Sequence, residues 1–443
     1  MTSLLWFRRD LRLGDNPALL AALGDGAVLP LFVVDPRLWR TSGAGRRAYL
    51  SASLRSLDAD LRRLGGGLAV VSGDPVGVVA DAAREVGAER VHLAADFGPY
   101  GRRRDLAVAE ALAAHGVETV RTGSPYAVAP GRMLNQSGEP YRVFTPFSKA
   151  WAEHGWRGPV AAPTAGQWLR LRHGESLPTV DWPDGLTPPP VGETAARERW
   201  ETFASEHLDA YADDRNRPDI DSTSRLSPAL RWGEIHPRTL LADLGTRRST
   251  GAAAYRAELA WREFYADVLF HHPHTARDYL RPEFAAMDYD EPGPLLDAWK
   301  EGRTGFPIVD AGMRQLRATG WMHNRVRMIV ASFLVKDLHL EWQHGARHFM
   351  EHLIDGDLAS NQHGWQWVAG SGTDAAPYFR VFNPTTQGRN FDPEGAYVRR
   401  WVPELADAAD PHEPGVVGGY PAPVVDHAAE RREALARFER IRR

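Results

Sequence analysis

Short, uninterrupted apolar runs recur through the first quarter of the chain. These runs lie at residues 4–7, 28–34, 68–71 and 91–94. They are typical of parallel strands that are buried on both faces. Amphipathic helical segments alternate with them, at about 46–64, 76–87 and 102–115. The alternation predicts a doubly wound α/β domain over residues 1–125, with helices on both faces of a parallel sheet.

The pattern changes after residue 125. Residues 126–195 are rich in Pro, Gly and Trp and show little periodicity, so we expect a long connector wrapped on the surface. From 196 to 443, helical periodicity dominates, and this segment is expected to form an all-α domain. Its clearest helical segments lie at 197–211, 237–244, 252–269, 294–301, 308–319, 324–338, 342–353 and 427–442.

Composition narrows the classes of protein that this chain can represent. A length of 443 residues favours two domains, and the absence of cysteine excludes disulfides and thiol chemistry and favours a cytoplasmic setting. No apolar run is long enough to span a bilayer, so we expect no membrane association. A net charge of −4 argues against binding nucleic acid through bulk charge but leaves room for a local basic face. The spacing of histidines and carboxylates predicts no metal site.

Carboxylates, amides and indoles crowd into residues 320–390. The indoles include Trp342, Trp365 and Trp367. Indole is a large, flat ring that can stack on a planar ligand, whereas tryptophans at helical spacing also serve as ordinary core. The indoles alone leave both interpretations open.

Four motifs together resemble the photolyase/cryptochrome family, most closely the class I cyclobutane pyrimidine dimer photolyases. They are Leu5-Trp-Phe-Arg-Arg-Asp-Leu-Arg-Leu-Gly-Asp-Asn-Pro17, Trp321-Met-His-Asn-Arg-Val-Arg-Met328, Asp355-Gly-Asp-Leu-Ala359 and Gly364-Trp-Gln-Trp367. The resemblance extends over nearly the whole chain. It implies an antenna-binding domain, a connector and a helical domain that binds FAD and damaged DNA. The implied activity is that of a monomeric lyase: excited, reduced FAD passes an electron to a flipped-out pyrimidine dimer and splits it. The alternative within the family is a cryptochrome-type blue-light receptor.

The resemblance also implies the residues around FAD. Small hydroxyls at Thr223, Ser224 and Ser227 would bond the pyrophosphate, although the same pattern is an ordinary helix cap. Arg327 and Asp355 would pair beside the flavin ring, and the neutral Asn361 would face its N5. The full set of implied FAD contacts is Tyr211, Thr223, Ser224, Arg225, Leu226, Ser227, Glu258, Arg262, Asn324, Arg327, Asp355, Asp357 and Asn361.

For the lesion, the resemblance assigns Glu258 and Asn324 to the base edges, so that Glu258, Asn324 and Asn361 are the expected catalytic residues. Trp261 and Trp367 would form an apolar wedge, with Met328 beside it. Relatives that repair (6-4) products carry histidines at the positions of Asn324 and Met328, so cyclobutane dimers are the expected substrate. Phosphates flanking the lesion would be bound by Arg215, Arg325 and Arg380.

Two further groups of residues follow from the resemblance. Arg46, Asp96, Arg104 and Arg231 match contacts to an 8-hydroxy-5-deazaflavin antenna, and Gly101 stands where folate-binding relatives use glutamate. Methenyltetrahydrofolate is the alternative antenna, and an arginine-rich region without any ligand is a third possibility. Trp365 and Trp342 match the inner and middle members of an electron-transfer chain, whose outer tryptophan is replaced here by Tyr289.

Overall fold

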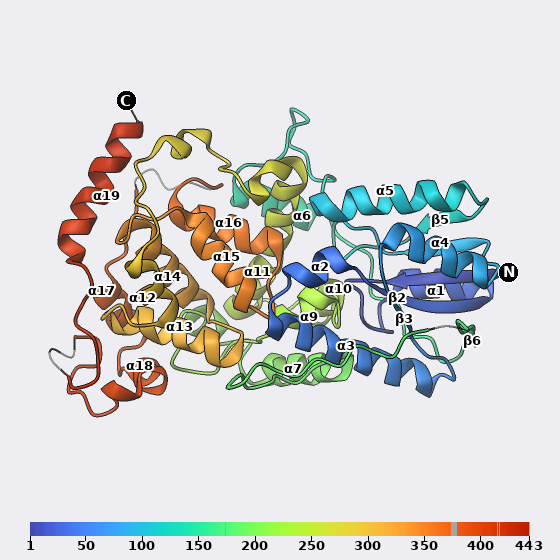
Figure 1. The fold of residues 1–443 in the computed structure, drawn as a ribbon, viewed down its shortest axis with the longest axis horizontal. Coiled ribbons are helices and arrows are strands. Elements are labelled where there is room, and N and C mark those ends of the chain that lie inside the picture. Colours follow the sequence, from blue (N-terminus) through green and yellow to red (C-terminus); the bar gives the residue numbers. More distant parts are fainter. Residues whose placement is uncertain (173, 374–378, 414, 416, 443) are drawn as a thin grey trace.

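The computed structural model describes residues 1–172, 174–373, 379–413, 415 and 417–442. It has two halves, an α/β domain and a helical domain (Figure 1). The N-terminal sheet contains β1 (Thr2–Phe7), β2 (Ala27–Val34), β3 (Ala69–Ser72), β4 (Arg90–Leu93) and β5 (Glu118–Arg121). These strands are parallel, in the order β3-β2-β1-β4-β5, and β6 (Gln167–Trp168) pairs with the start of β2.

Both faces of the sheet are covered, as the apolar runs predict. On β1, Leu4 and Trp6 pack under α4 (Pro75–Glu85) and α5 (Pro99–Ala113). Leu5 and Phe7 point to the opposite face, where α1 (Pro17–Asp25) and α3 (Ala44–Arg63) complete a second core. Alternation of side chains along one strand therefore divides the domain into two apolar layers.

The segment from 126 to 195 is only partly a surface connector. Its helix α6 (Phe144–His154) buries Phe147 and Trp151 in a core shared with α11 (Thr250–His271). The expectation of a segment wrapped on the surface is wrong for α6, because its apolar face finds a partner on α11.

From α7 (Glu193–Glu206) onward the chain is helical, and its two larger apolar clusters among the described residues, the first of which also takes in α6, are the two helical cores. The first is built mainly by α6, α7 and α11, with α8 (Tyr211–Asp214), α9 (Ser227–Trp232) and α10 (Pro237–Leu244). The second joins α12 (Pro294–Glu301), α13 (Pro307–Thr319), α14 (Asn324–Lys336), α15 (Trp342–His352) and α16 (Leu358–Ala369).

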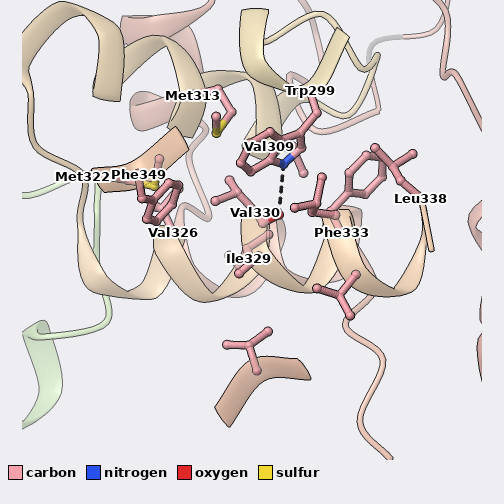
Figure 2. Packing of buried hydrophobic residues seen from close by; sticks show 14 of the residues in the cluster. Trp299, Val309, Met313, Met322, Val326, Ile329, Val330, Phe333, Leu338 and Phe349 are labelled. Atoms are coloured by element: carbon pink, nitrogen blue, oxygen red, sulfur yellow. Dashed lines mark hydrogen bonds between the residues drawn. The ribbon is translucent and has the colours of Figure 1, made fainter. Parts of the chain in front are cut away.

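Helix α14 is the centre of the second core. Figure 2 shows its Val326, Ile329, Val330 and Phe333 side chains among those of the neighbouring helices. The indole of Trp299, from α12, donates a hydrogen bond to the Val330 carbonyl at 3.0 Å. A helix that is apolar on most sides is held rigidly in place, and the polar residues of its first turn are positioned with it.

The remaining α-helices of the described chain are α2 (Pro36–Thr41), α17 (Pro384–Phe391), α18 (Ala396–Trp401) and α19 (His427–Ile441), and α18 buries Tyr397 and Val398 in the second helical core. Across the residues that the structure describes, every helix is too short or too polar to cross a membrane.

Candidate functional site

The loop between α15 and α16 carries a carboxylate that is only half satisfied. Asp355 is buried, and its Oδ2 accepts hydrogen bonds from the Ser227 hydroxyl at 2.6 Å and from Arg327 Nη2 at 2.7 Å. Its Oδ1 is buried without a hydrogen-bond partner among the described residues. A buried, unpaired carboxylate oxygen is costly, and a ligand N–H or O–H placed there would satisfy it.

Asn361, in the first turns of α16, has a side-chain amide oxygen that is free to accept a hydrogen bond from a ligand. Its amide N–H groups donate to the carbonyl of Ala346 at 3.1 Å and to the side chain of Gln362 at 2.8 Å. Both donors are therefore engaged, and the amide oxygen is left as a neutral acceptor. An acceptor without charge suits a ring N–H.

The segment from 221 to 227 holds the predicted hydroxyl groups. Ser224 Oγ accepts from the Tyr255 hydroxyl at 2.9 Å, while Ser227 bonds Asp355. Arg225 has a left-handed backbone, with φ of 48°, and its guanidinium lies 4.9 Å from the Trp321 ring centroid. Because α9 has only six residues, the hydroxyls and backbone amides, and not a helix dipole, are the groups available to an anion.

Two other predicted FAD residues have structural partners. Tyr211 is buried and lies edge-on to Tyr255, at 5.4 Å between ring centroids. Arg262 donates to the carbonyls of Pro125 and Leu230 at 3.0 and 3.1 Å. Arg262 thus fixes the end of the α/β domain against the helical domain.

Asp357 joins the two domains through a residue that sequence reasoning missed. Its Oδ2 lies 2.6 Å from Nη2 of Arg9, which follows β1, and its Oδ1 caps α16 by accepting from Ser360 N at 3.1 Å. Burial alone would raise the pKa of Asp357, but Arg9, Arg231 and Arg262 hold it well below its usual range. The Arg-Arg motif was visible in the sequence, but its partner, 348 residues away, was not.

Two of the predicted lesion residues form an ion pair. Arg215 Nη1 lies 2.8 Å from Glu258 Oε1, and burial raises the pKa of Glu258 despite that partner. Arg325 donates to the Asn216 side chain at 2.7 Å, while Asn324 is exposed at the start of α14. Cationic groups thus lie beside a carboxyl group that holds its proton more readily than usual.

The other predicted lesion residues lie against two different cores or at the surface. Trp261 stacks on Phe144 with centroids 3.7 Å apart and ring planes 6° apart. Trp367 and Met328 are half-buried against the second helical core. Arg380 is exposed, and its carbonyl accepts a hydrogen bond from Lys336. Phe144 was missed because it belongs to the presumed connector.

The predicted electron-transfer residues share the second core. Trp365 and Trp342 are both buried in it, and neither indole N–H has a partner in the described chain. The Trp342 ring lies 6.2 Å from Tyr279, and Tyr279 stacks at 6.3 Å on Tyr289. Tyr289 is therefore brought near Trp342, but through a second tyrosine that the sequence analysis did not consider.

Comparison with known proteins identifies the family. Residues 3–165 match the model described as DNA photolyase, and residues 255–440 match the FAD binding domain of DNA photolyase. A deoxyribodipyrimidine photo-lyase of Streptomyces griseus is 43% identical over 98% of both chains. The enzyme of that name from Escherichia coli is 40% identical over 100% of this chain and 99% of its own. The chain belongs to the DNA photolyase family.

Solved structures of photolyases extend this result to the fold. A class III photolyase from Agrobacterium tumefaciens superposes with a TM-score of 0.94 at 37% identity, covering 100% of this chain and 98% of that one. A Synechocystis cryptochrome has a TM-score of 0.90 at 27% identity, over 99% and 98%. The expected family, fold class, light-driven repair function and lyase activity are confirmed, as is FAD as a cofactor.

Two of the residues predicted to bind an antenna, Asp96 and Arg104, follow β4, which with β1 flanks the point where the strand order reverses, the usual ligand crevice of such sheets. Arg104 Nη2 bonds Asp96 at 3.2 Å, and Arg231 Nε donates to the carbonyl of Gly356 at 2.9 Å. Arg46 and Arg231 each keep one buried guanidinium nitrogen without a partner among the described residues. Burial lowers the pKa of Arg46 to about 10 and that of Arg231 to about 9. The guanidinium groups of Arg46 and Arg231 are buried and not fully hydrogen-bonded, and an anionic ligand would satisfy them.

One cluster contrasts with the expectation of no metal site. In the last turn of α15, ligand atoms of His348, Glu351 and His352 all lie within 4.8 Å of one another. The spacing His-x-x-Glu-His places all three on one helix face and could have revealed the cluster.

Proposed function

We propose that this photolyase binds reduced FAD in its helical domain and uses light to split cyclobutane pyrimidine dimers flipped out of DNA. When bound and excited, reduced FAD supplies the single electron that opens the cyclobutane ring. The observation that carries the proposal is the ion pair of Glu258 with Arg215, in which burial raises the pKa of Glu258. The cryptochrome alternative gains no specific support from the site.

FAD would be held at both ends by residues of this chain. The unpaired Oδ1 of Asp355 would accept from the flavin ring, while Arg327 neutralises Asp355 and keeps it in place. Asn361 would offer its amide oxygen to the ring N5–H, adding no charge next to an electron-rich ring. Thr223, Ser224, Ser227 and backbone amides of the same segment would bond the pyrophosphate, with Tyr211, Arg225, Leu226, Arg262 and Asp357 completing the pocket.

The dimer would be recognised by apolar contact with two indole rings and by a hydrogen bond from the Glu258 carboxyl group. A protonated Glu258 donates its hydrogen bond to a carbonyl of the dimer and stabilises negative charge that develops there. Trp261 and Trp367 provide apolar surface for the two stacked bases. Asn324 and Met328 offer no acid, which favours cyclobutane dimers over (6-4) products. Arg215, Arg325 and Arg380 would bind the flanking phosphates of a DNA partner.

For the antenna, we infer an 8-hydroxy-5-deazaflavin held by Arg46, Asp96, Arg104 and Arg231. Its phenol is acidic, and the unpaired guanidinium groups of Arg46 and Arg231 favour the anion. A Cβ atom at Gly101 would lie 2.2 Å from the Asp96 carboxyl group, which Arg104 and Gly98 N hold in place. A glutamate for folate is therefore disfavoured at Gly101.

A second FAD is a further antenna to be tested. A photolyase from Sulfolobus tokodaii, with a TM-score of 0.87 at 30% identity and covering 99% of this chain, was solved with two FAD molecules. Extraction of the chromophores from purified protein, followed by mass spectrometry, separates deazaflavin, folate and FAD.

For photoreduction, we propose that Trp365 supplies an electron to FAD, Trp342 refills Trp365, and Tyr289 is the terminal donor. Burial raises the pKa of Tyr289 to about 12, so oxidation of this phenol requires that its proton leaves. Repair by protein that is already reduced needs none of these steps.

Glu258→Gln and Glu258→Ala variants test the proposed lesion chemistry. Glutamine keeps a hydrogen-bond donor but cannot be an acid, so repair per photon absorbed should fall moderately in Glu258→Gln and further in Glu258→Ala. Repair is expressed per bound FAD in both variants, because Glu258 is also among the expected FAD contacts. Unchanged repair in Glu258→Ala would remove Glu258 from the catalytic residues.

A further inference from the structure

We propose that the last turn of α15 binds a divalent transition metal ion of the Zn²⁺ class through His348, Glu351 and His352. Their ligand atoms lie within 4.8 Å of one another, and small side-chain rotations would bring them to Zn²⁺ bonding distances of about 2.0–2.2 Å. Two imidazoles and a carboxylate leave a fourth tetrahedral position for water. The three residues belong to none of the flavin, lesion or antenna groups.

The two histidines differ in burial and in their hydrogen bonds. His348 is 7% exposed, and its Nε2 has no hydrogen-bond partner among the described residues. A buried ring nitrogen without a partner is costly, and coordination would satisfy it. His352 Nδ1 lies 3.1 Å from the carbonyl of His348, which fixes Nδ1–H as donor and leaves Nε2 as the ligand atom. Ligating histidines are typically oriented by such a bond.

Local charges both favour and oppose a cation at this cluster. His348 faces the neighbouring His352 and the positive charges of Lys300 and Arg317. The carboxylate of Glu351 and the carbonyl groups at the C-terminal end of α15 supply the negative field. Because Lys300 and Arg317 oppose them, we expect micromolar rather than tighter affinity.

The position of the cluster suggests what the ion would do. Only Leu353 and Ile354 separate His352 from Asp355 of the flavin loop. On the other side, the backbone of Glu351 lies directly against Gly43, where a Cβ atom would be 1.6 Å from the Glu351 carbonyl oxygen. A metal ion would brace the turn that carries the flavin loop and meets the start of α3. It should therefore stabilise the folded protein by mass action.

The test uses full-length, FAD-containing protein without an affinity tag, stripped by a chelator and titrated with Zn²⁺ by calorimetry. We expect one ion per chain, a rise in melting temperature, and at least about tenfold weaker binding in His348→Gln, Glu351→Gln and His352→Gln. His344→Gln is the matched control, one turn earlier on the same helix, and should bind as the parent does. Nitrogen coupling from two imidazoles in the Cu²⁺ electron paramagnetic resonance spectrum would identify the ligands independently.

Absence of stoichiometric Zn²⁺ binding would overturn the proposal, as would parent-like affinity in His352→Gln. His352 is only half-buried, so this variant should fold, which circular dichroism verifies. Repair activity should be unchanged in all four variants.

A separate observation concerns the exit of electrons, and it rests on the proposed photoreduction route. We infer that Tyr279 is the relay between Trp342 and Tyr289, with Glu341 as the proton acceptor. Tyr279 lies 6.2 Å from Trp342 between ring centroids, and its hydroxyl donates to Glu341 Oε1 at 3.1 Å. Burial, Tyr289 and Glu341 raise the pKa of Tyr279 above its usual range, so the neutral phenol persists until it is oxidised.

The relay step balances within these residues. Oxidised Trp342 takes one electron from Tyr279, and the phenol proton passes to the Glu341 carboxylate. A hydrogen atom then moves from Tyr289 to Tyr279 through the hydrogen bond between their hydroxyls, and an external thiol reduces Tyr289.

Transient absorption of oxidised protein distinguishes the two tyrosines. Tyr289→Phe should keep a tyrosyl signal, whereas Tyr279→Phe should lose it and photoreduce several-fold more slowly. Glu341→Gln should slow the step and change its deuterium isotope effect. A tyrosyl signal at the parent rate in Tyr279→Phe would overturn the relay. Repair after chemical reduction should be normal in every variant, and its absence in the parent would instead contradict the proposed function.

Discussion

At the scale of single residues, the site pairs two carboxyl groups with arginines and leaves other polar atoms without a partner in the described chain. Asp355 is neutralised by Arg327, and Glu258 faces Arg215. Among the buried polar atoms without a partner in the described chain are Asp355 Oδ1 and one guanidinium nitrogen each on Arg46 and Arg231. A ligand donor at Asp355 and an anionic ligand at the two arginines would satisfy these three atoms.

Trp261→Ala is the residue-scale prediction. The ring stacks on Phe144 and is half-buried, so its removal should take away stacking surface for the flipped dimer without destroying the core. Affinity for dimer-containing DNA should fall by about 1–3 kcal/mol, the usual contribution of an aromatic ring stacked on a base. Fluorescence anisotropy with damaged and undamaged oligonucleotides measures this. An equal loss for both DNAs would show that Trp261 does not read the lesion.

At the scale of elements, the first turn of α5 is built around close contact with the loop after β4. Gly101 leaves just enough room for Asp96, whose carboxylate accepts from Arg104 and from the backbone of Gly98. Arg104 also lies 5.0 Å from the Trp6 ring centroid, so the start of α5 is tied to β1. Because Gly101 has no side chain, Asp96 can lie against the first turn of α5, in the crevice proposed for the antenna.

Gly101→Ala should displace Asp96 and lower antenna occupancy, while FAD occupancy stays the same. Gly77→Ala, on α4, is the matched control because open space surrounds that position. Chromophore stoichiometry of protein made in a deazaflavin-producing host gives the answer. If the antenna binds normally to Gly101→Ala, Asp96 is not one of its contacts.

At the scale of the whole molecule, the pair of Arg9 and Asp357 fastens the α/β domain to the cap of α16. Because the folded-state pKa of Asp357 is depressed, the pair stabilises the fold above the ordinary aspartate pKa of about 3.9. That stabilisation is lost as the pH falls through the lower, folded-state value.

Asp357→Asn keeps the helix cap but removes the charge. At neutral pH it should lower the free energy of unfolding by about 3 kcal/mol, because Arg9 is left without its partner. The difference from the parent should shrink below about pH 4. Asp288→Asn is a matched control, since its pair with Arg440 is exposed. Urea unfolding at several pH values measures both, and a loss for Asp357→Asn that is independent of pH would contradict the ion-pair account.

The whole molecule has a net charge of −4, so binding to the phosphates of DNA requires a local cationic face. Arg380→Ala should reduce the log–log slope of affinity against salt by about 0.9, the value for one phosphate contact. Arg62→Ala, on α3 of the α/β domain, should leave the slope unchanged. An unaltered slope in Arg380→Ala would remove it from the phosphate contacts.

The sequence predicted what depends on local pattern or on the family motifs. Apolar runs located the strands, and the motifs anticipated the pairing of Arg327 with Asp355. Periodicity could not predict contacts between distant segments, such as Arg9 with Asp357, Phe144 with Trp261 or Tyr279 with Trp342, because such contacts are created only when domains and helices pack. The spacing of His348, Glu351 and His352, on which the metal proposal rests, is local and could have been noticed in the sequence.

The most direct test of the central claim is repair by the reduced protein under light. Chemically reduced protein is mixed with an oligonucleotide that contains one cis-syn thymine dimer and is then illuminated, and restored thymines are quantified by chromatography. We predict multiple turnovers that require light, with none in the dark and none on an oligonucleotide carrying a (6-4) product. Failure to restore thymines under light, or repair of the (6-4) product alone, would contradict the account.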